Sequence, residues 1–143
     1  MSSRPQTVPR RILVIEDNFD AAESLRDALE MEGHRVEIAH EGQAALALAR
    51  RFAPEIVLCD LGLPRMDGFA VARAFRADPS LRAAHLIALS GYSRAEDRER
   101  SAHAGFDKHV AKPVDLDSLE LMLAEVPTGS AHSPAQPKPT RVP

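Results

Sequence analysis

This sequence of 143 residues has little cysteine, no long apolar run and no hydrophobic leader. Its single cysteine, Cys59, excludes a disulfide framework and a cysteine-rich zinc site. No apolar run approaches the about 18 residues that a membrane span requires, and residues 1–10 lack the apolar core of a signal peptide. We therefore expect a cytoplasmic protein with no membrane partner.

Proline is scarce in the middle of the chain and frequent at both ends. Only four of the eleven prolines lie in residues 11–126. The two ends contain four cations and no anion, so a net charge of −3 for the chain corresponds to −7 for residues 11–126. We predict a flexible N-terminal segment (1–10), one acidic domain (11–126) and a Pro-rich flexible C-terminal tail (127–143). The acidity of the domain argues against nucleic acid as a direct partner.

Short apolar runs alternate with amphipathic stretches along the acidic domain. Three runs of four apolar residues are typical of strands that are buried on both faces of a parallel sheet: 12–15, 56–59 and 86–89. A weaker run covers 109–111. Residues 35–39 alternate between apolar and polar, which is expected of an edge strand with one face toward solvent.

A helical pattern follows each of these strands. The buried stripes of the first three helices are Ala22–Leu25–Leu29, Ala45–Leu48–Ala49–Phe52 and Phe69–Ala72–Phe75. A capping-box spacing at Ser93 and Glu96 opens the fourth helix, which ends at Gly105, and the fifth begins near Asp117. The order predicts a (βα)₅ fold of the α/β class, with a five-stranded parallel sheet covered by helices on both faces. The fourth helix has only two alanines as apolar residues, so we expect it to be the least firmly anchored.

Ionisable and polar residues stand at the carboxyl ends of the predicted strands. Glu16 and Asp17 follow the first strand, Asp60 and Ser90 end two others, and Lys112 follows the last. Ligands of open α/β sheets bind outside this edge. Three carboxylates in one small cleft repel one another unless a cation is present, and Mg²⁺ binds one or two carboxylates together with phosphate oxygens. The sequence therefore predicts a site that holds Mg²⁺ and accepts a phosphoryl group.

Four motifs at these strand ends resemble the receiver domain of bacterial two-component response regulators: VIEDN (14–18), LCDLGLPRMDG (58–68), ALSGY (88–92) and AKPVD (111–115). Their content, order and spacing all match, over about residues 11–126. The resemblance implies a flavodoxin-like fold with strand order 2-1-3-4-5. Because only one helix and the tail follow Pro113, we expect a stand-alone, single-domain regulator, which resembles the receivers of hybrid histidine kinases.

The resemblance implies specific roles for the acidic residues. Asp60 would be the phosphoacceptor. Asp17 and Asp60 would bind Mg²⁺ directly, and Glu16 would bind it through a water molecule. The backbone carbonyl of Gly62 would complete the protein's share of the coordination.

The resemblance also implies roles for residues of the last two strands. Ser90 would hydrogen-bond the phosphoryl group and Lys112 would pair with it. The bond between Lys112 and Pro113 is expected to be cis. His109 stands where the family usually has an aromatic switch residue. The candidate switch residues are therefore His109 and Ser90, which would respond to the phosphoryl group.

The expected function is that of a signalling module. The chain would accept a phosphoryl group from a histidine kinase or a histidine phosphotransfer protein, and would then bind an unknown downstream protein or pass the group along a relay. It would not be an enzyme beyond assisting its own phosphorylation and dephosphorylation, and would be a monomer or weak dimer.

Other interpretations use the same residues. A small Mg²⁺-dependent phosphohydrolase with Asp60 as nucleophile is an alternative, although its usual second acid is replaced by Gly62. A flavin-binding protein is set aside because residues 16–20 are acidic and would repel phosphate. Cys59 is expected to be a small core residue. Four histidines are expected at the surface or rim: His34, His40, His85 and His103.

Overall fold

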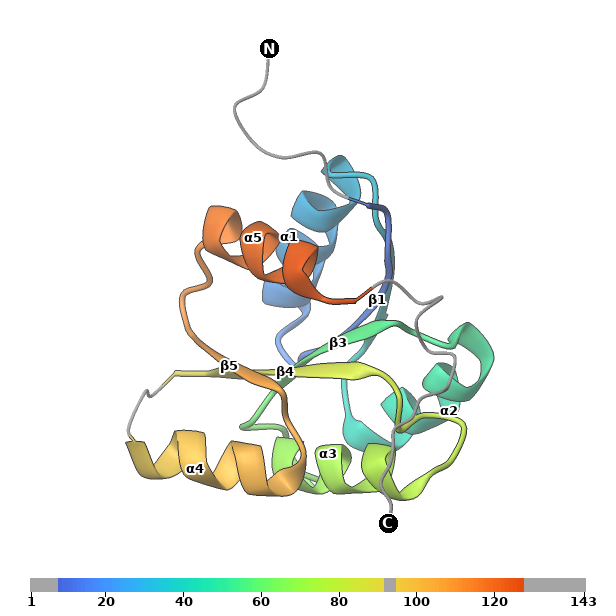
Figure 1. Ribbon diagram of the computed structural model, residues 1–143, viewed down its shortest axis with the longest axis vertical. Coiled ribbons are helices and arrows are strands. Elements are labelled where there is room, and N and C mark those ends of the chain that lie inside the picture. Colours follow the sequence, from blue (N-terminus) through green and yellow to red (C-terminus); the bar gives the residue numbers. More distant parts are fainter. Residues whose placement is uncertain (1–7, 92–94, 128–143) are drawn as a thin grey trace.

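Five parallel strands form one sheet in the computed structural model, which describes residues 8–91 and 95–127. The sheet order is β2–β1–β3–β4–β5 (Figure 1). The bounds of the strands are β1 Arg11–Ile15, β2 Arg35–Ala39, β3 Ile56–Asp60, β4 His85–Ser90 and β5 Lys108–Ala111. This topology confirms the predicted flavodoxin-like fold, and the alternating exposure of β2 fits an edge strand.

Five helices cover the two faces of this sheet within the described residues. Their bounds are α1 Phe19–Met31, α2 Gly42–Phe52, α3 Gly68–Ala77, α4 Ala95–Ala104 and α5 Leu116–Glu125. Helices α1 and α5 lie on one face, and α2, α3 and α4 lie on the other (Figure 1). No helix in the part of the chain that the structure describes is long and apolar enough to cross a membrane.

The strands divide their side chains between two hydrophobic cores. Alternate residues of a strand point to opposite faces of a sheet. Leu13 and Ile15 of β1 therefore pack in the core beneath α2 and α3, whereas Ile12 and Val14 pack in the core beneath α1 and α5. Burial on both faces is the physical reason for the runs of four apolar residues.

Polar side chains cap the starts of three helices. The side chain of Asn18 accepts a hydrogen bond from the backbone of α1, and Asp67 and Asp115 do the same for α3 and α5. The fifth helix thus begins at Leu116, next to the predicted start. Ser93, the predicted cap of α4, lies outside the described residues.

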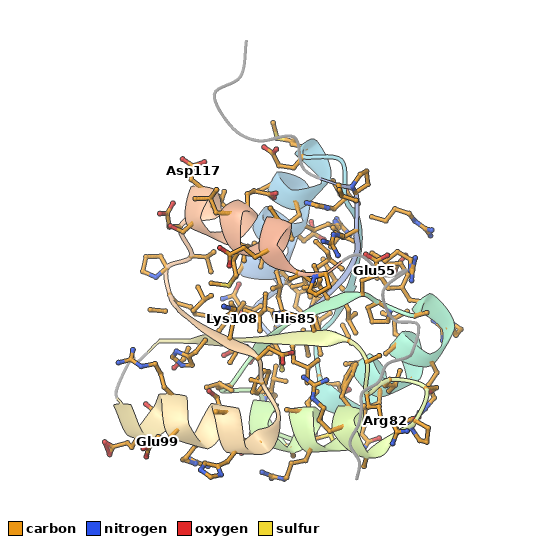
Figure 2. All side chains as sticks on the ribbon, in the orientation of Figure 1. Glu55, Arg82, His85, Glu99, Lys108 and Asp117 are labelled. Atoms are coloured by element: carbon orange, nitrogen blue, oxygen red, sulfur yellow. The ribbon has the colours of Figure 1, made fainter. Side chains whose placement is uncertain are left out.

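Helix α4 has the weakest apolar anchorage, as expected. Among its side chains from 96 to 104, only Ser101 and Ala104 are buried. The guanidinium of Arg100 lies 4.1 Å from the centre of the Phe69 ring of α3, in a cation–π contact. Glu99 points away from the sheet (Figure 2). Few apolar contacts therefore oppose a displacement of α4.

Arg10, at the end of the predicted N-terminal segment, is only 4 % exposed and binds the end of α5. Its guanidinium donates to the backbone carbonyls of Leu123, Val126 and Pro127. It also lies 3.6 Å from the carboxylate of Glu55, just before β3. This side chain thus joins the entry to β1, the start of β3 and the end of α5.

The expectation that His34 is a surface residue is wrong, because its side chain is buried. Its Nδ1 accepts a hydrogen bond from the backbone N–H of Arg10 at 3.0 Å. Its Nε2 lies 3.3 Å from the carboxylate of Glu120 on α5. These two bonds fix the tautomer with the proton on Nε2, and they satisfy both ring nitrogens inside the protein.

We expect Arg10→Met to lower the free energy of unfolding by about 2 kcal/mol or more, because three carbonyls at the end of α5 lose a charged donor. Arg11→Met is the matched control: the side chain of Arg11 is 40 % exposed and should cost less than about 1 kcal/mol. Urea denaturation, analysed with the same m-value for both variants and the wild type, measures the two changes in the free energy of unfolding. Equal losses would contradict the anchoring role of Arg10.

Candidate functional site

Three carboxylates gather at the carboxyl end of the sheet. Glu16 and Asp17 follow β1, and Asp60 is the last residue of β3, which is hydrogen-bonded to β1. Each residue offers a carboxylate oxygen, and the three oxygens lie within 4.8 Å of one another. The structure therefore brings together the acidic residues that the sequence selects.

Asp60 is held by both of its carboxylate oxygens. The residue is 8 % exposed. Its Oδ1 accepts a hydrogen bond from the backbone N–H of Gly62 at 2.9 Å, and its Oδ2 lies 3.3 Å from Nζ of Lys112. One oxygen is thus oriented by the main chain and the other faces a positive charge.

Lys112 connects two of the carboxylates. Its Nζ donates to Oε1 of Glu16 at 2.8 Å, in addition to its contact with Asp60. Partial burial disfavours the charge on Lys112, but the hydrogen bond to Glu16 and the negative charges of Asp60 and Glu16 outweigh it, so the pKa of Lys112 is raised. The bond between Lys112 and Pro113 is cis, as predicted.

Glu16 is 4 % exposed and has a partner for each oxygen. Oε1 binds Lys112, and Oε2 accepts a hydrogen bond from the backbone N–H of Asn18 at 3.0 Å. The carboxylate of Asp17, in contrast, is exposed and has no partner among the described residues. Asp17 is therefore the carboxylate of the three that is most open to a ligand from solvent.

Ser90 stands at the same edge of the sheet, on β4. Asp60 pairs in register with Leu89, so Ser90 lies one position beyond it. The backbone carbonyl of Ser90 accepts a hydrogen bond from the backbone N–H of Lys112 at 2.8 Å. Ser90 is buried, and the strand pairing places it beside the residues that flank the carboxylates.

His109 lies farther back on β5 and faces α4. Burial lowers its pKa, the charge of Arg98 lowers it further, and the charge of Asp97 opposes them. Its Nε2 is buried without a hydrogen-bond partner in the described part of the chain. A neutral imidazole therefore lies between β5 and α4.

Cys59 is a core residue, as predicted. It is fully buried on β3, and burial together with the negative charge of Asp60 raises the pKa of its thiol. A thiol in this environment is not a reactive nucleophile.

Gly68 matters to the site in a way that sequence reasoning missed. An Asp-Gly pair such as Asp67–Gly68 is typical of an ordinary turn. A Cβ atom at this position would lie 2.6 Å from the backbone oxygen of Asp60 and 2.7 Å from Cα of Leu61. The start of α3 thus packs directly on the main chain of the acidic residue. The only sequence signal was a glycine at the first position of a helix.

The donor set fits a hard divalent cation. Three carboxylates face one ammonium group, which leaves a formal charge of −2 within the described residues. Oxygen ligands and excess negative charge are what Mg²⁺ requires. Lys112 lies closer to Glu16, at 2.8 Å, than to Asp60, at 3.3 Å, and Asp17 has no ion pair within the described residues.

Comparison with known proteins identifies similar chains. The family model of the response regulator receiver domain matches residues 12–124. An uncharacterized 14.6 kDa protein of Leptolyngbya boryana is 39 % identical over 111 residues, which cover 78 % of this chain and 83 % of that protein. Polar-differentiation response regulator DivK of Brucella anthropi is 29 % identical, over 76 % of this chain and 89 % of DivK.

Solved structures agree with these matches. The receiver domain of a sensor histidine kinase from Pseudomonas aeruginosa, with a magnesium ion coordinated in its active-site cleft, has a TM-score of 0.76 and 30 % identity, over 83 % of this chain and 98 % of that chain. Chemotaxis protein CheY4 of Vibrio cholerae has a TM-score of 0.79 at 23 % identity, over 83 % of this chain and 99 % of that chain, and is similar in fold. The similarity covers all five strands.

Gly68→Ala is expected to lower the free energy of unfolding by about 1–3 kcal/mol, because the new methyl group overlaps backbone atoms that cannot rotate away. Backbone amide chemical shifts of Asp60 and Leu61 should move as well. Gly91→Ala is the control, since its Cβ would have no atom within 4 Å. The packing argument fails if the two variants are equally stable.

The lowered pKa of His109 predicts that the free energy of unfolding depends on pH. Its pKa in the folded protein is below the ordinary 6.5, so the unfolded chain binds the proton first and stability falls as the pH drops through that value. His109→Asn should reduce the loss of stability between about pH 7.5 and 5.5. A residual loss should remain, because burial also lowers the pKa of His85. Urea denaturation across this pH range measures the free energy of unfolding. A loss of stability in His109→Asn as large as in the wild type would contradict the prediction.

Proposed function

Because this chain belongs to the response regulator receiver domain family, we propose that it accepts a phosphoryl group on Asp60 from a histidine kinase or a histidine phosphotransfer protein. Its Mg²⁺-dependent phosphorylation then controls binding to another protein or passes the group along a relay. The observation that carries this proposal is the cluster of three carboxylate oxygens within 4.8 Å of one another, beside a single ammonium group.

The proposed metal site consists of oxygen ligands. Asp17 and Asp60 would bind Mg²⁺ directly, Glu16 through a water molecule, and Gly62 through its backbone carbonyl. When bound, Mg²⁺ would neutralise charge on the carboxylates and on the phosphoryl oxygens. The excess of negative charge at the site and the exposed position of Asp17 support this assignment.

Asp60 would act as the nucleophile. A carboxylate needs no base to remove a proton, so an oxygen of Asp60 forms a bond to phosphorus while the bond from phosphorus to the donor's histidine nitrogen breaks. In-line phosphoryl transfer depends mainly on positioning and charge neutralisation. The hydrogen bond from Gly62 N–H to Oδ1, at 2.9 Å, supplies part of that positioning.

Lys112 and Ser90 would bind the transferred group. Nζ of Lys112 lies 3.3 Å from Oδ2 of Asp60, within reach of a phosphoryl group on that residue. The aspartyl phosphate adds about −1.5 to −2 units of charge and three acceptor oxygens. The hydroxyl of Ser90 would donate to one of them, which would draw the end of β4 toward the site.

The response would reach partners through α4. The chain runs from Ser90 at the end of β4 into α4, whose only buried described side chains are Ser101 and Ala104. A small displacement of α4 is therefore opposed by few apolar contacts. His109, which faces α4 from β5, is the second candidate switch residue.

The proposal also covers the bounds of the domain, its location in the cell and its oligomeric state. Residues 11–126 would form the receiver, flanked by the N-terminal segment and the Pro-rich tail, which lie mostly outside the described residues. We place the chain in the cytoplasm, as a monomer or weak dimer whose downstream partner is a protein rather than nucleic acid or membrane. Gly62 offers only main-chain groups beside Asp60, so this position cannot supply the general acid of a phosphohydrolase.

Labelling with acetyl phosphate tests this function. We expect one phosphoryl group per chain in the presence of Mg²⁺, and loss of that labelling after Asp60→Asn or removal of Mg²⁺ by a chelator. Asp67→Asn is the matched control, because Asp67 caps α3 and its side-chain oxygen accepts the same bond as an amide. Labelling that persists in Asp60→Asn would refute the assignment of the phosphoacceptor.

A further inference from the structure

His40, which is not among the proposed ligands, contacts the chain on both sides of Asp17. It follows β2 directly, in the connection to α2. We propose that His40 is a positioning residue that fixes the main chain of the acidic pair, Glu16 and Asp17, and thereby strengthens Mg²⁺ binding. This inference rests on the proposed function, in which that pair belongs to the metal site.

The first contact is a hydrogen bond to the backbone of Glu16. Nδ1 of His40 lies 2.9 Å from the carbonyl oxygen of Glu16. A carbonyl oxygen can only accept, so Nδ1 carries the proton. The backbone N–H of Glu16 donates to the carbonyl of Ala39 at 3.0 Å. Two consecutive residues, Ala39 at the end of β2 and His40 after it, therefore bind the two backbone polar groups of Glu16.

The second contact is a ring stack with Phe19, the first residue of α1. The centres of the two rings are 3.6 Å apart and their planes differ by 13°. Phe19 is 63 % exposed, so this stack is not a consequence of burial in a core. The imidazole instead covers one face of the Phe19 ring at the surface of the protein.

Together these contacts hold the chain on both sides of Asp17 against the imidazole of His40. Glu16 precedes Asp17 and Phe19 follows it by two residues. The carboxylate of Asp17 has no partner of its own in the described part of the protein, so its position depends on the backbone on either side. A bond to a backbone carbonyl orients Asp17 without neutralising its charge.

The same connection also reaches the segment that follows Asp60. Glu41, the residue after His40, lies 3.2 Å from the guanidinium of Arg65 in the β3–α3 connection. The β2–α2 connection thus contacts Glu16 through His40 and the segment that follows Asp60 through Glu41. Its contact with Glu16 is the one that bears directly on the acidic pair.

Two substitutions separate the contacts of His40. His40→Asn places an amide N–H where Nδ1–H lies and removes the stack. His40→Phe keeps a ring to stack on Phe19 and removes the hydrogen bond. Calorimetric titration of the full chain with Mg²⁺ measures the affinity. We expect His40→Phe to bind Mg²⁺ about tenfold more weakly than the wild type, which is the smaller end of the effect seen when a residue that orients a metal ligand is removed. His40→Asn should bind Mg²⁺ with nearly the wild-type affinity.

A second measurement distinguishes positioning from general stability. Urea denaturation without Mg²⁺ should show both variants folded, and the rate of labelling from acetyl phosphate should return to the wild-type value in His40→Phe at saturating Mg²⁺. A wild-type affinity in His40→Phe, or an equally weak affinity in His40→Asn, would overturn the inference while leaving the proposed function intact. A wild-type chain that binds no Mg²⁺ would overturn both.

Discussion

Repulsion among Glu16, Asp17 and Asp60 is the constraint on which the rest of this structure depends. Their oxygens lie within 4.8 Å of one another, and within the described residues their ion pairs involve Lys112 alone. Such a cluster raises the free energy of the folded chain unless a cation is bound. The cost is offset by the sheet, which is buried on both faces and does not open to relieve it. Burial of the sheet thus stabilises the folded chain against the repulsion at the site. A bound dication would raise the free energy of unfolding further.

The same sheet holds its helices with unequal strength, and this inequality fits a signalling role. Helix α5 is fastened at its end by the guanidinium of Arg10 and along its length by the buried pair of His34 and Glu120. Helix α4 has a solvent-exposed cation–π contact and two buried small residues. A change of charge at the strand ends would therefore displace α4 before α5. The proposed output through α4 rests on this difference between the two helices in buried polar contacts.

Local patterns in the sequence predict the strands and the helices, because each depends on neighbours along the chain, and the parallel arrangement of the strands then predicts the acidic site. Runs buried on both faces stand out as four apolar residues, and the polar residues at strand ends meet because parallel strands end at one edge. The features that were missed depend on distant partners. His34 is 86 residues from Glu120, and Arg10 is 116 residues from Val126. Nothing in the sequence around His34 indicates that a carboxylate and an amide will satisfy its ring. Likewise, the need for glycine at position 68 arises only when α3 packs on Asp60.

The distribution of cations bears on our proposal that the imidazole of His40 positions the acidic pair. Arg10 and Arg76 bind backbone carbonyls at the amino edge of the sheet, near the starts of β1, β3, β4 and β5. A guanidinium at the carboxyl edge could orient Glu16 and Asp17 equally well, but it would also pair with their carboxylates and compete with a metal ion. An imidazole that donates to the carbonyl of Glu16 avoids this conflict, because it binds the main chain and leaves the carboxylates charged. Orientation and charge are thereby controlled by different groups, which is what a site that must bind a cation reversibly requires.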